Sequence, residues 1–553
     1  MKIFGTIYPF VETNNDSYRL GRYVANFEFL RALLTANRFD EYHLFCMNPS
    51  HAKLTIEKLQ GVELQDEVLQ KIRVFQFTDL VPRLKVTEYH VFHLGGWGYF
   101  FSGLSHLRNR YAQKPFPITG IIHSMNGLET NYHAHKIIFA PLLPYDTVIC
   151  SSRAGEQVFQ NILSKVSAAL ESHGTRVTYT GGTHMIPLAV DDRFATSRSS
   201  TSCRKQLNLP ADAFIVLMVG RFSVQSKMDL YPALQCHKKM QSASLPRPVF
   251  LVMAGGGATD ELNIVKSIVD ELDISASTRI IANFNDDTKA MLYQAADVYL
   301  SVTDNLQETF GISVVEAMMA GKPAVISDIN GYKELIEDGI HGYKIPTTWI
   351  QQFETVELAE IMNFNTMQLM LSQCMAIDTE HLFNALCTLA SDAENTAQMG
   401  AAAKEHATKR FSWSSVMVKY HELWDSLHAN ILKLDESELK TLRSMPNPFI
   451  NDYLNAFDHY PTHKISPEMW CRITPDGKDA LAQGRVPAAY SDIRELLHVD
   501  YQGAVLRTIE QHPLKVETLI ENRLAGLSES DAQFNLLWLA KYGLVALRTS
   551  LDD

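Results

Sequence analysis

The chain has 553 residues, enough for more than one hydrophobic core, so we expect at least two domains. It is 46% hydrophobic and 20% charged, an ordinary globular balance, and no apolar run is long enough to span a membrane. The formal net charge of -12 argues against nucleic acid as the main partner. The seven scattered cysteines form no CxxC pair, which predicts reduced thiols in a cytoplasmic protein rather than a disulfide framework or a zinc site.

Short apolar runs alternate with helical patterns along most of the chain, which predicts Rossmann-like α/β domains. In the first domain the expected strands lie at residues 2–7, 42–47, 73–77, 91–94, 117–123 and 147–151, with a helix at 18–35. A polar stretch rich in Ser and Thr at 195–202 indicates a linker. We therefore expect a first domain at 1–195 and a second at 205–410.

The second domain opens with an apolar strand at 214–219, followed by Gly220, Arg221 and then Lys227. Glycine permits a tight turn, and both cations would stand at the carboxyl end of a parallel strand, where such sheets bind ligands. A forked guanidinium and a compact ammonium together suit a diphosphate. The alternative is that both side chains are solvated surface cations.

The most informative stretch is 295–336, which predicts a short strand at 297–302, a polar turn, and a helix at 312–320. The start of that helix leaves backbone N–H groups without intrahelical partners, and a phosphate or diphosphate suits such groups. These N–H groups belong to Thr309, Phe310, Gly311 and Ile312.

Two carboxylates frame this helix start, Glu308 just before it and Glu316 within its first turns. Carboxylates repel phosphate but accept hydrogen bonds from hydroxyls, so we interpret Glu308 as a sugar contact and Glu316 as a ribose contact. The alternative is that Glu308 serves the helix dipole and that Glu316 is a solvated helix residue.

Glu308 and Glu316 are separated by seven residues, with Phe-Gly after the first and Ala-Met-Met-Ala-Gly-Lys-Pro after the second. This pattern resembles the signature of glycosyltransferase family 4. The resemblance covers roughly residues 118–423 and implies the GT-B fold, in which two Rossmann-like domains face a cleft. It also implies that a helix at 411–435 crosses back to the first domain.

The resemblance implies a retaining transferase that uses a nucleotide-diphosphate sugar, with UDP favoured on family frequency. The sequence has no Asp-x-Asp metal clamp in a suitable place, so we expect the protein cations to replace a metal, and we expect no cofactor. Retention in the family is usually explained by front-face attack with the leaving phosphate as the base, so we assign no carboxylate nucleophile. Catalytic roles are implied for Arg221, Lys227, Glu308 and His123. Contacts with the nucleotide sugar are implied for Asn15, Asn283, Phe284, Thr309, Phe310, Gly311, Ile312 and Glu316.

Two loops of the first domain leave their role open. The turn before the first helix carries Asn14-Asn15 where the family usually has paired glycines. Asparagine tolerates left-handed backbone, so this turn either still approaches phosphate or is a plain Asx turn that caps the helix. The aromatic, Gly-rich loop at 95–101 either shapes an acceptor pocket or packs on the wall between the domains.

Residues 440–553 lie outside the resemblance and carry an apolar pattern sufficient for a small, mainly helical core. The end of the chain resembles the last helix and wing of a winged-helix module, but acidic residues outnumber basic ones there, which disfavours DNA. We expect this extension either to hold a protein partner, a second copy of the chain or a polypeptide acceptor, or to pack on the catalytic domains.

Two alternative functions stay open. A phosphorylase or sugar-phosphate synthase of the same architecture would need a free phosphate or a pyridoxal phosphate site, for which the sequence gives no clear signal. A scaffold or binding protein with a relict transferase fold is favoured only by the altered turn at Asn14-Asn15. The sequence does not indicate which acceptor is used or which sugar is transferred.

Overall fold

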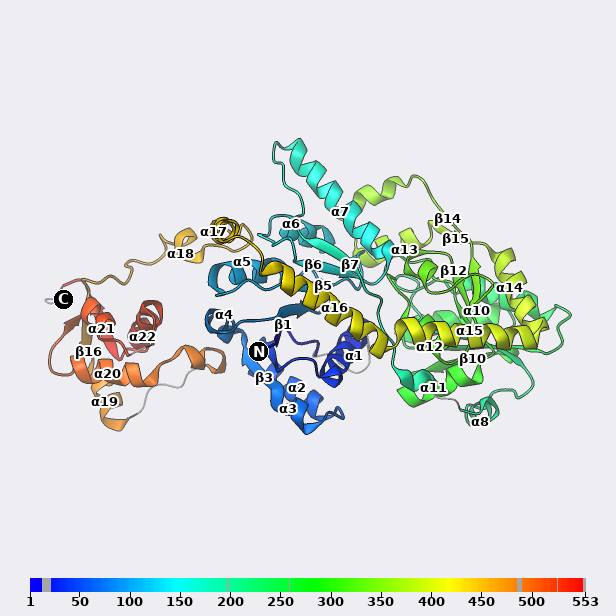
Figure 1. The fold of residues 1–553 in the computed structure, drawn as a ribbon, viewed down its shortest axis with the longest axis horizontal. Helices are drawn as coiled ribbons and strands as arrows, with labels where there is room; N and C mark the ends of the chain where they lie inside the picture. Colours follow the sequence, from blue (N-terminus) through cyan, green and yellow to red (C-terminus); the bar gives the residue numbers. More distant parts are fainter. Residues whose placement is uncertain (12–20, 196–197, 258, 485–489, 525, 551–553) are drawn as a thin grey trace. The chain divides into compact units, whose positions relative to one another are not determined.

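The computed structural model describes residues 1–11, 21–195, 198–257, 259–484, 490–524 and 526–550. The chain divides into two compact units. The larger comprises Met1–Met47 and His51–Asn447, and the smaller comprises Asn48–Ser50 and Pro448–Asp553. Figure 1 traces their helices and strands along the chain. Within the described ranges, no helix combines the length and the apolar character needed to cross a lipid bilayer.

The larger unit contains two parallel sheets, which define a first and a second domain. The strands of the first sheet are, in order across it, β3 (Ile72–Gln76), β2 (Glu41–Cys46), β1 (Ile3–Ile7), β4 (Val91–Leu94), β5 (Ile118–Ile121), β6 (Thr147–Cys150) and β7 (Gly182–Met185). The strands β1 and β4 are buried along their whole length. Such burial is typical of parallel strands covered on both faces.

Helices pack on both faces of the first sheet. One face carries α4 (Leu80–Val86), α5 (Phe101–Tyr111), α6 (Thr130–Ile138) and α7 (Arg153–Ser172). The other face carries α1 (Gly21–Ala36), α2 (Pro49–Gln60), α3 (Asp66–Lys71) and the much later α16 (Trp413–Ile431). The fully buried Trp424 of α16 donates from Nε1 to Thr119 Oγ1 of β5 at 3.1 Å, so α16 is an integral part of the first domain.

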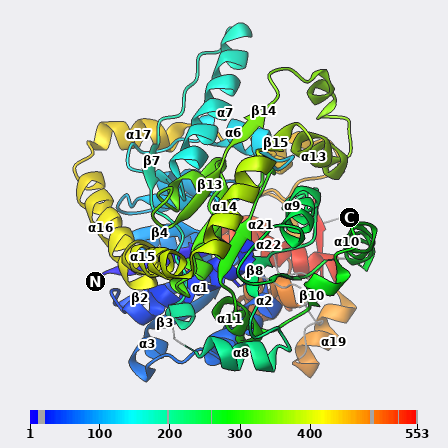
Figure 2. The same ribbon diagram turned by 90° about the vertical axis from the view of Figure 1, so that its right-hand side faces the viewer.

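The second sheet has six parallel strands. Across the sheet they are β10 (Thr278–Ala282), β9 (Val249–Gly255), β8 (Phe214–Val219), β11 (Val298–Ser301), β12 (Ala324–Ser327) and β13 (Gly342–Ile345). One face packs on α8 (Ser200–Gln206), α11 (Asp286–Ala295), α12 (Ile312–Met319) and α15 (Ala393–Phe411). The other face packs on α9 (Tyr231–Gln241), α10 (Thr259–Glu271) and α14 (Thr379–Ser391), which Figure 2 shows from the side of this domain.

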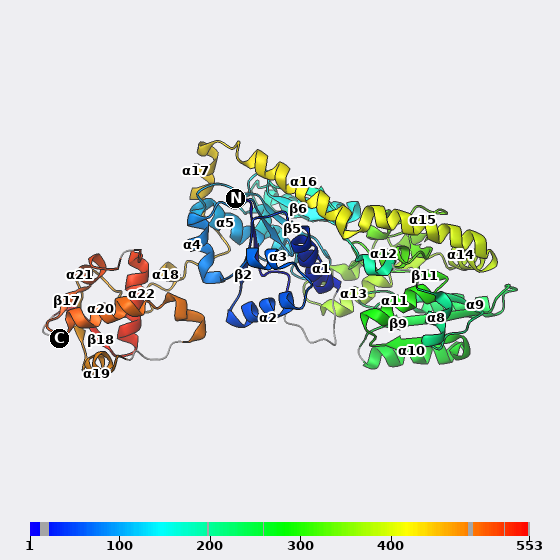
Figure 3. The ribbon, with the colours of Figure 1, turned by 60° about the horizontal axis from the view of Figure 1, so that its bottom comes forward.

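The chain crosses from the second domain to the first between α15 and α16, which follow one another with only Ser412 between them (Figures 1 and 3). Ser412 caps α16 by accepting a hydrogen bond from the N–H of Ser415 at 3.3 Å. The Phe411 carbonyl accepts from the N–H of Val190, the point where the chain first leaves the first domain. Both connections between the domains are therefore hydrogen-bonded to each other.

An excursion interrupts the connection from β13 to α14. It consists of β14 (Thr347–Trp349), α13 (Phe364–Ser372) and β15 (Met375–Ile377), and the two strands form an antiparallel ribbon. Asn126 of the first domain donates to Gln368 of α13 at 2.7 Å. The excursion thus connects the second domain to a loop that follows β5.

The strand order reverses once in each sheet, between β1 and β4 in the first and between β8 and β11 in the second. At such a switch point, neighbouring loops leave in opposite directions and open a crevice outside the carboxyl ends of the strands. Ligands of open parallel sheets bind in that crevice. The two switch points therefore locate the regions in which a functional site is expected.

The smaller unit has its own hydrophobic core and a three-stranded antiparallel sheet of order β17-β16-β18. Its elements are α18 (Tyr453–Ala456), β16 (Trp470–Ile473), α19 (Pro475–Gln483), α20 (Val499–Ile509), β17 (Leu514–Lys515), α21 (Val516–Glu521), α22 (Glu529–Lys541) and β18 (Val545–Arg548). The preceding α17 (Glu436–Ser444) belongs to the larger unit, where Arg443 Nε donates to the Asn109 carbonyl at 3.2 Å. The compact part of the extension thus begins at Pro448.

Candidate functional site

The loops that leave β8 and β11 meet at the switch point of the second sheet. Lys227, on the first loop, places Nζ 2.7 Å from Glu308 Oε2, on the second. Three hydrogen bonds fasten the same two loops: Thr303 Oγ1 to the Lys227 carbonyl (2.7 Å), Asn305 Nδ2 to the Gln225 carbonyl (2.5 Å), and the Asp229 N–H to the Asp304 carboxylate (3.2 Å). The backbone around Lys227 is thereby fixed as well as its ammonium group.

Arg221 follows Gly220 in the loop after β8 and is half-buried, as is Lys227. Both act on Glu308 electrostatically. Burial alone would raise the pKa of Glu308, but Lys227, the Phe310 N–H and Arg221 together hold it below its ordinary value. Glu308 is therefore ionised at neutral pH and lies beside two cations.

The helix α12 starts at Ile312, directly after this loop, and its N-cap is Gly311. The φ of Gly311 is +113°, and a Cβ there would lie 2.4 Å from the ring of Tyr332, so only glycine fits. The N–H of Phe310 lies 3.4 Å from Glu308 Oε1. Glu308 thus contacts the predicted anion site of the helix start and the cation Lys227 at the same time.

Glu316 is only 4% exposed, which excludes the alternative that it is a solvated helix residue. Its Oε1 accepts from Lys289 Nζ at 2.6 Å, and its Oε2 accepts from the hydroxyl of Tyr293 at 2.7 Å. The predicted ribose contact therefore has two partners within the protein, both on α11. No local sequence pattern links either partner to Glu316.

Asn283 and Phe284 follow the end of β10, at the same edge of the sheet. Asn283 is exposed and has a left-handed backbone, with φ of 54°, and Phe284 is half-buried against the core. Asn15, for which a phosphate contact was predicted, lies outside the described residues.

His123 follows β5 in the first domain, and its Nε2 lies 2.8 Å from Asn26 Oδ1 of α1. Burial and the nearby charge of Arg22 lower the pKa of His123 to about 3, so the ring is neutral at pH 7. The His123 carbonyl accepts a hydrogen bond from Thr309 Oγ1 at 2.8 Å, and the Thr309 carbonyl accepts from Ser152 Oγ at 2.7 Å. Thr309 therefore connects the loop with Glu308 to the first domain at two points.

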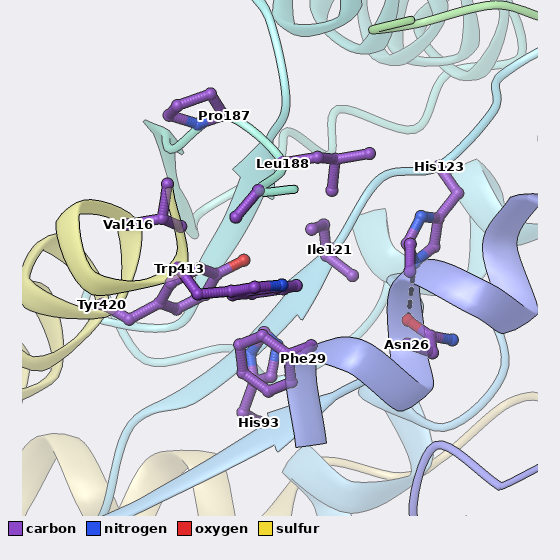
Figure 4. A pocket seen from close by; sticks show the side chains of 12 residues that line it. Asn26, Phe29, His93, Ile121, His123, Pro187, Leu188, Trp413, Val416 and Tyr420 are labelled. Carbon is purple, nitrogen blue, oxygen red and sulfur yellow. Dashed lines mark hydrogen bonds between the residues drawn. The ribbon is translucent and has the colours of Figure 1, made fainter. Parts of the chain in front are cut away.

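Figure 4 shows a pocket beside His123, between α1, β5 and the start of α16. Its lining is mostly apolar and aromatic, with Asn26, His93 and His123 as the polar contributors. The indole ring of Trp413 lies across the pocket. Its Nε1 is buried and has no hydrogen-bond partner among the described atoms.

The residues that sequence reasoning missed are those that hold the predicted ones in place. Lys289, Asn26 and Ser152 pair with site residues that lie far away along the chain. Asp304 and Asn305 fall in a stretch that the sequence marked only as a polar turn. Their near-complete burial, which no pattern in the turn indicates, is what reveals their role.

Residues 199–363, which contain this switch point, match the family model described as "Glycosyl transferases group 1". The D-inositol 3-phosphate glycosyltransferase of Saccharomonospora viridis is 27% identical over 218 residues, 39% of this chain and 43% of that protein. The enzyme of the same name from Corynebacterium urealyticum is 24% identical over 274 residues, 48% of this chain and 54% of that protein. The chain spans about half the length of the curated relatives it matches.

Solved structures agree with this assignment at the level of the fold. Anabaena Alr3699/HepE in complex with UDP superposes with a TM-score of 0.52 at 17% identity, over 77% of this chain and all of that one. Sucrose-phosphate synthase from Thermosynechococcus elongatus gives 0.52 at 18% identity, over 78% and 100%. The larger unit has the GT-B fold, and residues 199–363 within it match the group 1 glycosyltransferase model. The family 4 assignment and the nature of residues 440–553 stay predictions.

Proposed function

We propose that the chain is a retaining glycosyltransferase that moves a sugar from a nucleotide-diphosphate sugar, with UDP favoured, to an acceptor. The observation that carries the proposal is the ionised pair of Lys227 and Glu308, beside Arg221 and directly before the start of α12. Two cations and the N–H groups at the start of the helix suit the diphosphate, while the carboxylate suits sugar hydroxyls.

In the proposed reaction the bond between the anomeric carbon and the diphosphate oxygen breaks, and a bond to the acceptor oxygen forms on the same face. The acceptor proton passes to an oxygen of the leaving phosphate, so no protein nucleophile is needed. Arg221 and Lys227 stabilise the charge that develops on the diphosphate, which is electrostatic catalysis by preorganised groups. The neutral ring of His123 accepts or donates hydrogen bonds near the sugar without adding charge.

The ribose would occupy the region of Glu316. Lys289 and Tyr293 already fix both oxygens of this carboxylate and balance its charge, so the remaining lone pairs face a defined direction. A ribose hydroxyl can donate a further hydrogen bond to this oriented carboxylate, which a sugar without that hydroxyl cannot do.

A panel of UDP, GDP and ADP sugars, scored by thermal shift and by hydrolysis without acceptor, tests the proposal. We expect one donor class to stabilise the protein by mass action and to be hydrolysed slowly. Arg221→Ala should abolish most hydrolysis, whereas Arg198→Ala, which removes an exposed cation paired with Asp287 in the same domain, should not. No stabilisation and no hydrolysis with any donor would favour the scaffold alternative, and cleavage that needs free phosphate would favour a phosphorylase.

Metal independence is part of the proposal, since Arg221 and Lys227 supply the positive charge that a metal would otherwise bring. Donor hydrolysis should therefore persist in EDTA. Complete loss in EDTA, restored by manganese or magnesium, would contradict this part of the proposal and leave the transferase assignment intact.

A further inference from the structure

The first sheet has its own switch point, between β1 and β4, and none of the described residues assigned to the diphosphate lies on the loops that leave it. The loop after β4, residues 95–100, leaves at this point, and the residues that follow β5 lie next to it. Because ligands of parallel sheets bind at switch points, this edge of the first domain is a second candidate region. We expect the acceptor to bind at this edge, an expectation that rests on the proposed function.

Aromatic side chains gather at this edge. The loop at 95–101 was predicted either to shape an acceptor pocket or to pack on the wall between the domains. In this loop Trp97 and Phe101 are buried, while Tyr99 is 56% exposed. Tyr132, in the first turn of α6, is 53% exposed. The buried part of the loop thus packs into the hydrophobic core of the first domain, and the rings of Tyr99 and Tyr132 are open to solvent.

Contacts with neighbouring side chains hold these two exposed rings in fixed positions. Both contact the buried ring of His133, Tyr99 at 4.7 Å and Tyr132 at 5.8 Å between ring centroids. The hydroxyl of Tyr99 donates to Glu129 Oε2 at 2.8 Å, and Lys136 Nζ lies 5.4 Å from the centroid of the Tyr132 ring. Exposed aromatic side chains with so many fixed contacts lose little conformational entropy when a ligand binds.

A glycine makes this arrangement possible. A Cβ on Gly98 would lie 2.5 Å from the His133 ring, so any other residue would push the loop away from it. Strain on the neighbouring loop points to the same edge, because Tyr8, directly after β1, has a φ of 56° although it is a bulky residue. The Tyr8 ring lies 6.4 Å from that of Phe100.

We infer that Tyr99, Tyr132 and Glu129 form an acceptor subsite for a neutral carbohydrate. The C–H face of a pyranose ring packs flat on a phenol ring, and the carboxylate of Glu129, 62% exposed, accepts hydrogen bonds from ring hydroxyls. A phosphorylated acceptor would meet the Glu129 charge at close range. The nearby cation, Lys136, is half-buried and already engaged by the Tyr132 ring and by the Tyr99 carbonyl at 3.4 Å.

Binding and transfer are tested separately with maltotetraose, cellotetraose and N-acetylchitotetraose, and with myo-inositol 1-phosphate and a serine-rich peptide for comparison. Saturation-transfer NMR measures binding on the full chain without donor. We expect at least one tetrasaccharide to bind, and Tyr99→Ala and Tyr132→Ala to weaken its binding by about tenfold each, since each removes one packing face. Tyr132→Phe, which keeps the ring, should bind as the wild type does.

The matched control is Trp349→Ala, which removes an exposed aromatic ring on β14 in the second domain and should change nothing. Donor hydrolysis should be equal in all these variants. Absence of tetrasaccharide binding at millimolar concentration, or equal binding by wild type and both alanine variants, would overturn the inference. Transfer to inositol phosphate or to the peptide alone would also overturn it. If the wild type hydrolyses no donor, the proposed function is refuted instead. The NMR measurement would still show whether a tetrasaccharide binds at Tyr99 and Tyr132.

Discussion

At the residue scale, Lys227 and Glu308 depend on each other, and this leads to a prediction for both activity and stability. Lys227→Met should lower turnover by about two to three orders of magnitude, because one preorganised charge beside the leaving diphosphate is lost. The folded protein should also lose about 1–3 kcal/mol, because the half-buried Glu308 would be left without its cation.

The double variant K227M/E308Q separates the two effects. With both charges removed, most of the stability should return while turnover stays low. Donor hydrolysis and thermal unfolding measure the two quantities. Turnover near that of the wild type in Lys227→Met would contradict the diphosphate assignment, and equal stability of the single and double variants would contradict the electrostatic coupling.

Asp304 predicts a pH dependence of stability. Burial, with the nearby charge of Asp229 adding to it, raises the pKa of Asp304 from 3.8 to about 7. The folded state therefore binds a proton that the unfolded state has lost, so the contribution of Asp304 to stability falls as pH rises between about 4 and about 7. Between pH 5 and 8, the melting temperature of the wild type should fall relative to that of Asp304→Asn, whose amide does not titrate. Parallel curves for the two proteins would refute the assignment.

At the scale of elements, the β11–α12 loop connects to the first domain through Thr309. Thr309→Val keeps the shape of the side chain but loses the hydrogen bond to the His123 carbonyl, worth about 1 kcal/mol. We expect transfer to slow by about fivefold to tenfold while donor hydrolysis changes less. The reason is that the first domain, which holds the proposed acceptor subsite, is then less firmly positioned against the β11–α12 loop. Thr309→Ser keeps the hydroxyl and should restore transfer. Equal rates for the valine and serine variants would show that the contact has no functional role.

The elements that could be predicted from the sequence are those with strong local patterns. The strand β8 is a continuous apolar run, and the helix α12 has apolar residues at helical spacing after a glycine, so both were placed within one or two residues. The excursion with β14 and β15 was not predicted, because its ribbon pairs residues such as Thr347 and Ile377 that are far apart in sequence. The three-stranded sheet of the smaller unit was missed for the same reason, apart from β18.

The candidate site shows the same limit. Glu308, Glu316 and the helix start are contiguous in sequence, so their pattern could be interpreted without a structure. The contacts of Thr309 with Ser152 and with the His123 carbonyl span 157 and 186 residues, and only the tertiary fold brings these groups together. The glycosyltransferase prediction is supported at the level of the domain, whereas the residue roles await the measurements above.

At the scale of the whole molecule, the smaller unit is a separate core outside the matched family region. Exposed apolar side chains such as Leu537 on α22 and Val499 at the start of α20 suit a protein partner better than solvent. Because the proposed acceptor subsite lies in the first domain, we expect this unit to hold a second copy of the chain. Removal of the smaller unit tests this prediction.

The structure fixes where to cut. α17 packs on the first domain through Leu439, which joins Leu143 and Ile431 in a small buried cluster, so truncation before α17 would damage the larger unit. A chain that ends at Asn447 should keep donor hydrolysis and transfer to a neutral saccharide, while its mass in solution falls by more than the deleted residues account for. A chain that ends at Lys433, which also loses α17, is the control for damage and should unfold at a lower temperature. If the chain ending at Asn447 keeps both activities and loses only the mass of the deleted residues, the smaller unit does not mediate self-association. If transfer is lost while donor hydrolysis is kept, the smaller unit binds the acceptor.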